Sequence, residues 1–220
     1  MKYIFYFLSF ITILNVYNCS SSDDSSEDNS NTNNQINPEP KTLIPDPVFE
    51  QYLIDNSIDD VLDGQVTTSL LAEITILILD DLNITDLTGI KDFVNLDNLW
   101  LQNTNLTLLN VSQNTALKFL YFDNNSVSVI NVSSLANLEK LSFKNNNIQT
   151  INVSNNLNLQ ILEINGNNIT SLDVSANNEL FTLNTIDNPL TCIQVNENQL
   201  ENIPINWEQD MDDIYSLDCN

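Results

Sequence analysis

Apolar residues recur along most of the chain at a fixed spacing. The pattern that begins at Leu96 returns at Leu117, Leu138 and Leu159, each time after 21 residues, and a fifth copy follows at Leu180. Within each copy, apolar and variable residues alternate, which is typical of a short β-strand with one buried face. Because a unit this short cannot bury its leucines alone, neighbouring units must stack into one continuous core.

The units share more than their leucines. Each strand segment is followed by an asparagine at a turn, and each unit closes on an Asn/Asp-Val-Ser triplet such as Asn110-Val-Ser112. This arrangement, L-x-x-L-x-L-x-x-N-x-L-x-x-L, resembles the leucine-rich repeat family, whose repeat lengths include this period. The resemblance implies a repeat solenoid over residues 74–199, mostly β, with a parallel sheet on the concave face and short extended segments on the convex side.

The turn asparagines have a defined role in that family, where they point inward and bond the backbone of the turn. The resemblance therefore implies an asparagine ladder between coils, made by Asn125, Asn146, Asn167 and Asn188. Thr104 and Leu82 occupy the equivalent position in the two preceding coils. We expect these two residues to break the ladder and to leave their coils less tightly locked.

A solenoid needs caps, because its terminal coils expose leucines. Asp46 and Pro47 are suited to the N-cap and first turn of a helix, with Phe49, Tyr52 and Leu53 on one face, so residues 43–73 predict a small helical N-terminal cap. Together with the segment up to residue 90, this block is similar to the N-terminal part of internalin-like repeat proteins.

Residues 200–220 predict a C-terminal cap. Cys192 and Cys219 are the cysteines besides Cys19, and an oxidising environment outside the cell favours a disulfide between them that pins this cap. Two free buried thiols are the alternative, because sequence alone does not fix connectivity.

The N-terminus predicts export. Lys2 precedes an apolar run that ends near Val16, as in a secretory signal peptide, here residues 1–18. The segment ending at Cys19 resembles the lipobox of bacterial lipoproteins, although Tyr17 and Asn18 depart from it. With the Ser/Asp run that follows, it looks like surface lipoproteins of the Bacteroidetes. This resemblance implies lipidation at Cys19 and a cell-surface position on the outer membrane. An ordinary secretory signal with an incidental cysteine is the alternative.

The segment after the signal has little apolar character. Its composition predicts a flexible, acidic, Ser/Asn-rich stalk over residues 19–42.

Composition narrows the function. The chain has 30 Asp+Glu, 6 Lys+Arg, no His and a formal net charge of −24, so nucleic acids and anionic membrane surfaces are repelled and the lipid anchor is the expected membrane contact. The chain has no His, which is the commonest general base and zinc ligand, and its 3 Cys are too few for a four-thiolate zinc site. Its 3 Gly are too few for a phosphate-binding loop. We therefore expect no enzymatic activity, metal or cofactor.

Two acidic segments could be mistaken for metal sites. Asp59–Gly64 begins like a calcium loop, but we interpret it as a capped turn, since Val61 and Leu70 occupy ligand positions. Asp210–Asp213 reads as a solvated acidic face.

The candidate binding surface is the concave sheet face. Residues between the buried leucines should point outward there, namely Ile76, Ile78, Trp100, Phe119, Tyr121, Lys140, Ser142, Lys144, Ile161 and Glu163. A contiguous group of exposed aromatic residues usually marks recognition, and aromatic rings also suit sugars. The predicted ligand-binding residues are Ile78, Trp100, Phe119, Tyr121, Lys140, Lys144 and Glu163.

The sequence therefore predicts a monomeric, surface-tethered module that binds a protein or glycan through this face. Two alternatives stay open. The rings could simply pack on one another across strands, as cross-strand aromatic pairs do. The solenoid could also be a structural adaptor of the cell envelope that has no dedicated ligand on its concave face.

Overall fold

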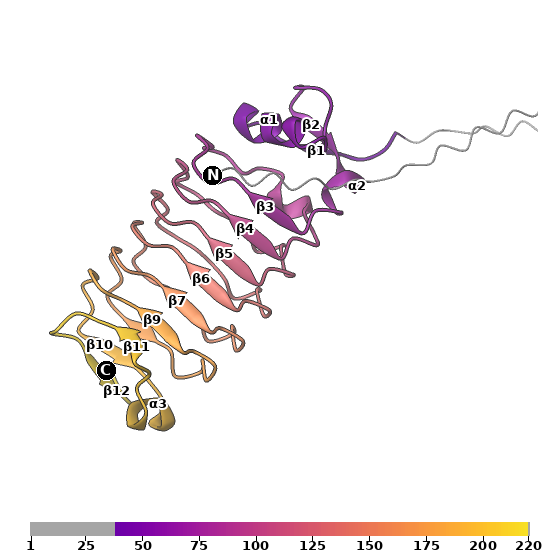
Figure 1. The fold of residues 1–220 in the computed structure, drawn as a ribbon. Helices are drawn as coiled ribbons and strands as arrows, with labels where there is room; N and C mark the ends of the chain where they lie inside the picture. The colour runs from indigo at the N-terminus through magenta and orange to yellow at the C-terminus, as the bar shows by residue number, and fades with distance from the viewer. Residues whose placement is uncertain (1–37, 220) are drawn as a thin grey trace, which may run out of the picture. The chain divides into compact units, whose positions relative to one another are not determined.

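Seven parallel strands run side by side in the computed structural model, which describes residues 38–219 (Figure 1). In spatial order from one end they are β3 (Ile76–Ile78), β4 (Asn98–Trp100), β5 (Phe119–Tyr121), β6 (Lys140–Ser142), β7 (Ile161–Glu163), β9 (Thr182–Asn184) and β11 (Asn206–Glu208). Their central residues pair in register and form one buried row: Leu77, Leu99, Leu120, Leu141, Leu162, Leu183 and Trp207. The predicted stacking of the leucines, and with it the predicted fold class, is confirmed.

A second, smaller sheet lies across the core from the last main strands. It contains β8 (Leu172–Asp173), β10 (Cys192–Gln194) and β12 (Ile214–Ser216), all parallel. One core runs without interruption from the N-terminal cap to Trp207, and within it Phe122 stacks on Phe143 with ring centroids 5.4 Å apart. Each buried leucine contributes about 2 kcal/mol relative to its exposed state, so the continuous apolar core is the main source of stability.

The N-terminal cap has one helix with strong end signals. Helix α1 (Pro47–Asp55) starts where predicted, with Asp46 as N-cap, and Phe49 stacks on Phe93 of the first coil at 5.9 Å. Strands β1 (Lys41–Leu43) and β2 (Gln65–Thr67) form an antiparallel pair, followed by α2 (Thr68–Leu71); a short 3-10 helix, η1 (Ile90–Asp92), lies in the first coil. Strand β1 begins inside the segment predicted as stalk.

Asp46 joins the cap to the solenoid. Its Oδ1 accepts hydrogen bonds from the backbone N–H groups of Val48 and Phe49, at 2.9 and 3.1 Å. Its Oδ2 accepts from the N–H groups of Thr85 and Asp86, at 2.8 and 3.2 Å. Burial alone would raise the pKa of Asp46, but these four donors outweigh it and hold the pKa below its usual value.

The C-terminal cap contains helix α3 (Glu197–Glu201), which starts with a capping box between Asn196 and Gln199. Beyond it, β11 joins the main sheet, so the solenoid continues past the predicted boundary at residue 199. The predicted disulfide between Cys192 and Cys219 is confirmed. It holds the tail against β10, and Tyr215 on the neighbouring β12 meets Trp207 of β11 with ring centroids 5.6 Å apart.

The turn asparagines lock each coil to the one before it. Asn146 is typical: its Nδ2 donates to the carbonyls of Phe143 in its own coil and Phe122 in the previous coil, and its Oδ1 accepts from the N–H of Val127. Asn125, Asn167 and Asn188 repeat this pattern. Thr104 interrupts the ladder on one side, as predicted. Its hydroxyl lies 3.1 Å from the Leu101 carbonyl oxygen of its own coil and 2.6 Å from Asn125 Oδ1 of the next coil, but within residues 38–219 its side chain makes no hydrogen bond to the coil before it.

A second ladder runs along the opposite turns. The fully buried Asn114, Asn156 and Asn177 each donate through Nδ2 to two backbone carbonyls, both of them in the previous coil, and Gln199, also buried, does the same in the last coil. This ladder was not predicted, because Leu135 takes the position between Asn114 and Asn156.

The predictions for the N-terminus fall outside the described residues. These are the signal peptide (1–18), the lipidation site Cys19 and most of the stalk. Within residues 38–219, none of the helices has the length and apolar character needed to cross a membrane.

Candidate functional site: the open face of the main sheet

The outward side chains of the seven-stranded sheet form one continuous surface, called here the sheet face and predicted above as the concave face. Each strand presents its first and third residues, and the residue two positions later continues on the same side. Its N-terminal part carries five apolar side chains, which we call the apolar patch: Ile76, Ile78, Trp100, Phe119 and Tyr121.

The apolar patch is held together by ring stacking and remains accessible. Trp100 and Tyr121 pair in register on β4 and β5, and their rings stack with centroids 4.2 Å apart and planes inclined by 28°. Both rings and Phe119 are half-buried, whereas Ile76 and Ile78 at the sheet edge are 55% and 51% exposed. Burial raises the pKa of the Tyr121 hydroxyl, against the opposing effect of Lys140, so Tyr121 is neutral at physiological pH.

Two lysines and two acids form an ionic cluster beside the patch. Lys140 Nζ lies 2.9 Å from Glu163 and 5.1 Å from the centre of the Tyr121 ring. Lys144 Nζ lies 3.3 Å from Asp123 and 3.7 Å from Glu163. Burial would raise the pKa of Glu163, but the hydrogen bond and charge of Lys140, with Lys144, lower it below its usual value. The lysine charges are therefore balanced within the protein.

Asp123 belongs to this site, and the sequence analysis missed it. Its carboxylate is buried at 3% exposure and accepts hydrogen bonds from the Ser142 hydroxyl, at 2.7 Å, and from the Lys144 N–H, at 2.9 Å. Ser142, expected to be available on the surface, is fully buried beneath its neighbours. Asp80 accepts from the Gln102 N–H in the same way, so an Asp two residues past a strand was a usable signal.

The structure thus brings together Trp100, Tyr121, Lys140, Lys144 and Glu163, with Ile78 and Phe119 on the same face. A further acid, Asp80, lies next to the apolar patch. It follows Ile78 of β3 by two residues and therefore lies on the same face. Burial raises the pKa of Asp80; the Gln102 N–H opposes this rise, and the negative charges of Asp81 and Asp123 add to it.

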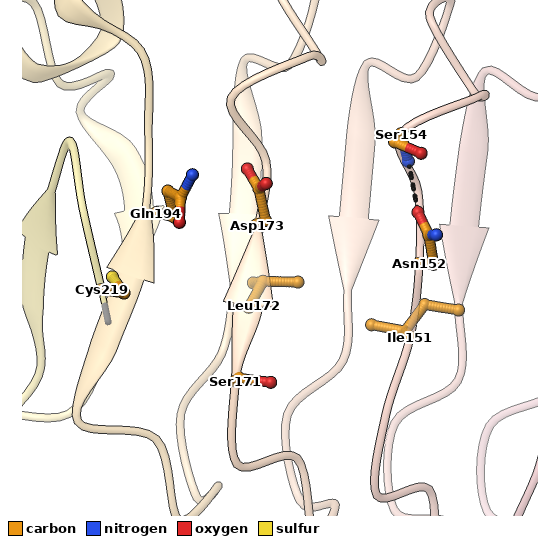
Figure 2. Close-up of a pocket in the computed structure, with 8 residues that line it drawn as sticks. All are labelled: Ile151, Asn152, Ser154, Ser171, Leu172, Asp173, Gln194 and Cys219. Atoms are coloured by element: carbon orange, nitrogen blue, oxygen red, sulfur yellow. Dashed lines mark hydrogen bonds between the residues drawn. The ribbon is translucent and has the colours of Figure 1, made fainter.

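A shallow depression on the other side of the coils is less suited to binding. It is lined by Ile151, Asn152, Ser154, Ser171, Leu172, Asp173, Gln194 and Cys219. Figure 2 shows these residues on separate segments, with Asn152 turned towards Ser154, whose N–H it accepts at 3.0 Å. Asp173 likewise accepts from the Ser175 N–H. The Oδ1 atoms of Asn152 and Asp173 are thus engaged in their own turns, and the lining has none of the aromatic rings found on the sheet face.

The acidic loops are organised by internal contacts. In the loop that begins like a calcium site, the N–H groups of Asp63, Gly64 and Gln65 all donate to the buried Glu50 carboxylate, so the turn is closed by an internal anion. The prediction that Asp210–Asp213 form a solvated acidic face is wrong for Asp213. Its side chain is 4% exposed, and burial raises its pKa. No group of three or more Asp, Glu, His or Cys side chains within residues 38–219 is arranged to hold a metal ion.

Known structures share this architecture. The chain is 27% identical to the functional domain of InlJ from Listeria monocytogenes, with a TM-score of 0.61 over 71% of this chain and 38% of that chain. It is 17% identical to an internalin, InlF, of the same organism, with a TM-score of 0.57 over 79% and 68% of the two chains. The leucine-rich repeat domain of APL1B is 24% identical, with a TM-score of 0.52 over 58% and 43%.

These comparisons show an internalin-like leucine-rich repeat fold. The match spans 38% of the InlJ domain chain, well under half of its length. The InlJ domain includes a cysteine ladder, whereas residues 38–219 of this chain hold two cysteines, joined to each other. Neither a protein-family model nor a curated protein matches the chain.

Proposed function

We propose that the chain is a non-enzymatic module that binds a protein partner through the apolar patch of the sheet face. Support comes from the fold, which is typical of binding proteins, and from five large apolar side chains gathered on an otherwise acidic molecule. Such patches on soluble proteins are usually interaction sites, and Trp and Tyr dominate binding energy where they occur.

The surroundings of Tyr121 favour a protein over a glycan. Tyr121 lies between Trp100 on one neighbouring strand and Lys140 on the other, so both of its faces are covered. A sugar that stacks on an aromatic platform needs a free ring face, whereas a protein partner can pack apolar side chains against ring edges and the exposed isoleucines. The stacked pair is the observation that carries the proposal.

The test compares the patch with a control surface. The double variant Trp100→Ala with Tyr121→Ala removes the stack. The control, Leu108→Ala with Val129→Ala, removes side chains that are 77% and 72% exposed and lie outside the main sheet. Both variants are checked for the folded state by circular dichroism, and binding is measured against surface proteins and against a glycan array.

We expect protein binding to weaken at least about 30-fold in the patch variant, as for a hot-spot residue, and to persist in the control. Glycan binding that depends on Trp100 would show that the ligand of the patch is a sugar and not a protein. Protein binding that survives the patch variant would remove the sheet face as the site and favour the structural adaptor role.

We also propose that Cys19 carries a lipid anchor that tethers the module to the outer membrane surface, on the strength of the lipobox resemblance alone. Metabolic labelling with a radioactive fatty acid should mark the wild-type chain and fail to mark Cys19→Ala. Equal labelling of both would exclude Cys19 as the anchor.

A further inference from the structure

The charges around the apolar patch point to the chemistry of the partner, an inference that rests on the proposed function. Both lysines of the sheet face are paired with Asp123 and Glu163. A partner carboxylate would have to break these pairs and expose the acids behind them. The ionic cluster is therefore poorly suited to recognising an acidic ligand.

Acids on the patch's outer side are not balanced in this way. Asp80 accepts a hydrogen bond from the Gln102 N–H, and Asp81 accepts one from Asn103 Nδ2, but among residues 38–219 neither forms an ion pair with a lysine. The two carboxylates are consecutive, and the negative charge of Asp81 adds to the cost of the charge on Asp80. A cation placed beside them would relieve this repulsion.

Apolar and acidic groups are also adjacent. Asp80 follows Ile78 by two residues, which places both side chains on the same face, and Ile78 pairs in register with Trp100. A cation at Asp80 would thus lie next to an apolar group packed on Ile78 and Trp100. The net charge of −24 would further attract a basic partner over distances set by the salt concentration.

We propose that the partner's contact segment carries an apolar or aromatic side chain next to a lysine or arginine. The apolar side chain packs against Ile78 and Trp100, and the cationic group lies at Asp80, within reach of the negative charge of Asp81. The partner is a protein with a basic, apolar surface segment, and the ionic cluster at Lys140 and Lys144 acts against acidic segments.

The experiment uses phage-displayed random peptides, selected on the immobilised protein and then tested as synthetic peptides. Asp80→Asn removes the charge and keeps Oδ1 as acceptor for the Gln102 N–H. The matched control is Asp173→Asn, which removes the same charge on the opposite side of the coils; asparagine occupies the equivalent position in three other coils, at Asn110, Asn131 and Asn152, and accepts the same turn hydrogen bond there.

We expect the selected peptides to combine an apolar residue with lysine or arginine. Their affinity should fall roughly three- to fivefold in Asp80→Asn, as for a surface ion pair, and stay unchanged in Asp173→Asn. The difference between the two variants should shrink as salt rises from about 50 to 300 mM. Trp100→Ala should abolish binding.

The outcomes separate this inference from the proposed function. Peptides that require Trp100 but show no basic residues, or that bind Asp80→Asn as tightly as the wild type, would overturn the inference and leave the function standing. Equal losses in Asp80→Asn and Asp173→Asn would show attraction by net charge alone and would overturn it too. Peptides indifferent to Trp100→Ala, or a selection that yields no binder, would count against both.

Discussion

Gly89 is a single residue on which the docking of the N-terminal cap depends. Its φ is +99°, and a Cβ added there would lie 2.3 Å from Ile44 Cδ1 and 2.6 Å from the Leu43 carbonyl oxygen. We expect Gly89→Ala to destabilise the protein by about 3 kcal/mol or more, because both the backbone and the cap must shift.

The matched control for Gly89 is Gly64, which also has a positive φ, +81°, but whose added Cβ would meet nothing within 4 Å. Gly64→Ala should therefore cost only about 1 kcal/mol of backbone strain. Urea unfolding followed by circular dichroism measures both. Equal losses in the two variants would show that the contact with Ile44 does not matter.

Asp46 should make stability depend on pH. Its folded-state pKa is lowered from 3.8, so its contribution is complete above that value and is lost as pH falls through the folded pKa. Asp46→Asn should cost about 2 kcal/mol at neutral pH, because an amide cannot accept all four backbone donors. The gap between wild type and variant should be constant from about pH 5 to 7 and narrow below about pH 4.

Acid unfolding at a series of pH values measures this gap, with the exposed Asp55→Asn as control. A gap that stays constant down to about pH 3 would contradict the role given to the Asp46 charge.

Single residues are where sequence reasoning was least complete. The helix start at Asp46 was predictable, because an N-cap acid before proline is a local signal. The break at Thr104 was predictable, because a hydroxyl cannot make all the bonds of an amide, whereas its contact with Asn125 Oδ1 at 2.6 Å was not, because no pattern of residue types expresses it. The burial of Ser142 and Asp123 depends on neighbours one coil away.

The ladders are the features of the repeat unit that fix the position of each coil. Asn146→Ala should cost about 3 kcal/mol, because it removes bonds to the Phe122 and Phe143 carbonyls and leaves the buried Val127 N–H without an acceptor. The adjacent Asn147 is exposed, and Asn147→Ala should change stability by less than about 0.5 kcal/mol. Chemical denaturation compares them, and a loss at Asn146 as small as at Asn147 would contradict the ladder's importance.

Elements that recur without exception could be predicted, and those with an interruption could not. The row of leucines and the first ladder repeat in register, so their stacking follows from the sequence. The second ladder has Leu135 in its middle and ends on a glutamine, Gln199, so it lacks a uniform period. The sequence predicted that Lys140, Lys144 and Glu163 lie on one face, but which charges pair depends on side-chain positions that the sequence does not show.

At the scale of the whole molecule, each coil contacts its neighbours, so stability should vary along the solenoid. The disulfide closes a loop over a sequence separation of 27, which stabilises by about 3–4 kcal/mol in the chain-entropy model. Reduction should therefore loosen the C-terminal cap before the rest unfolds. Trp207, 8% exposed in the cap, reports this opening once Trp100 is replaced by Phe.

The measurement follows Trp207 fluorescence and far-ultraviolet circular dichroism during urea unfolding of Trp100→Phe, with and without reductant. We expect the fluorescence transition to move to lower urea than the circular dichroism transition after reduction, and both to coincide in the oxidised protein. Coincident transitions after reduction would show that the cap and repeats unfold as one unit.

The constant register of the strands has a consequence for how such a chain can change over generations. From Leu120 to Leu183 every central residue pairs with its counterpart one unit away. An in-frame duplication or deletion of one complete unit would therefore join two surfaces that already fit. A break one residue out of step would turn the leucines outwards. Recombination can thus lengthen or shorten the recognition surface in whole steps while both ends of the molecule stay as they are.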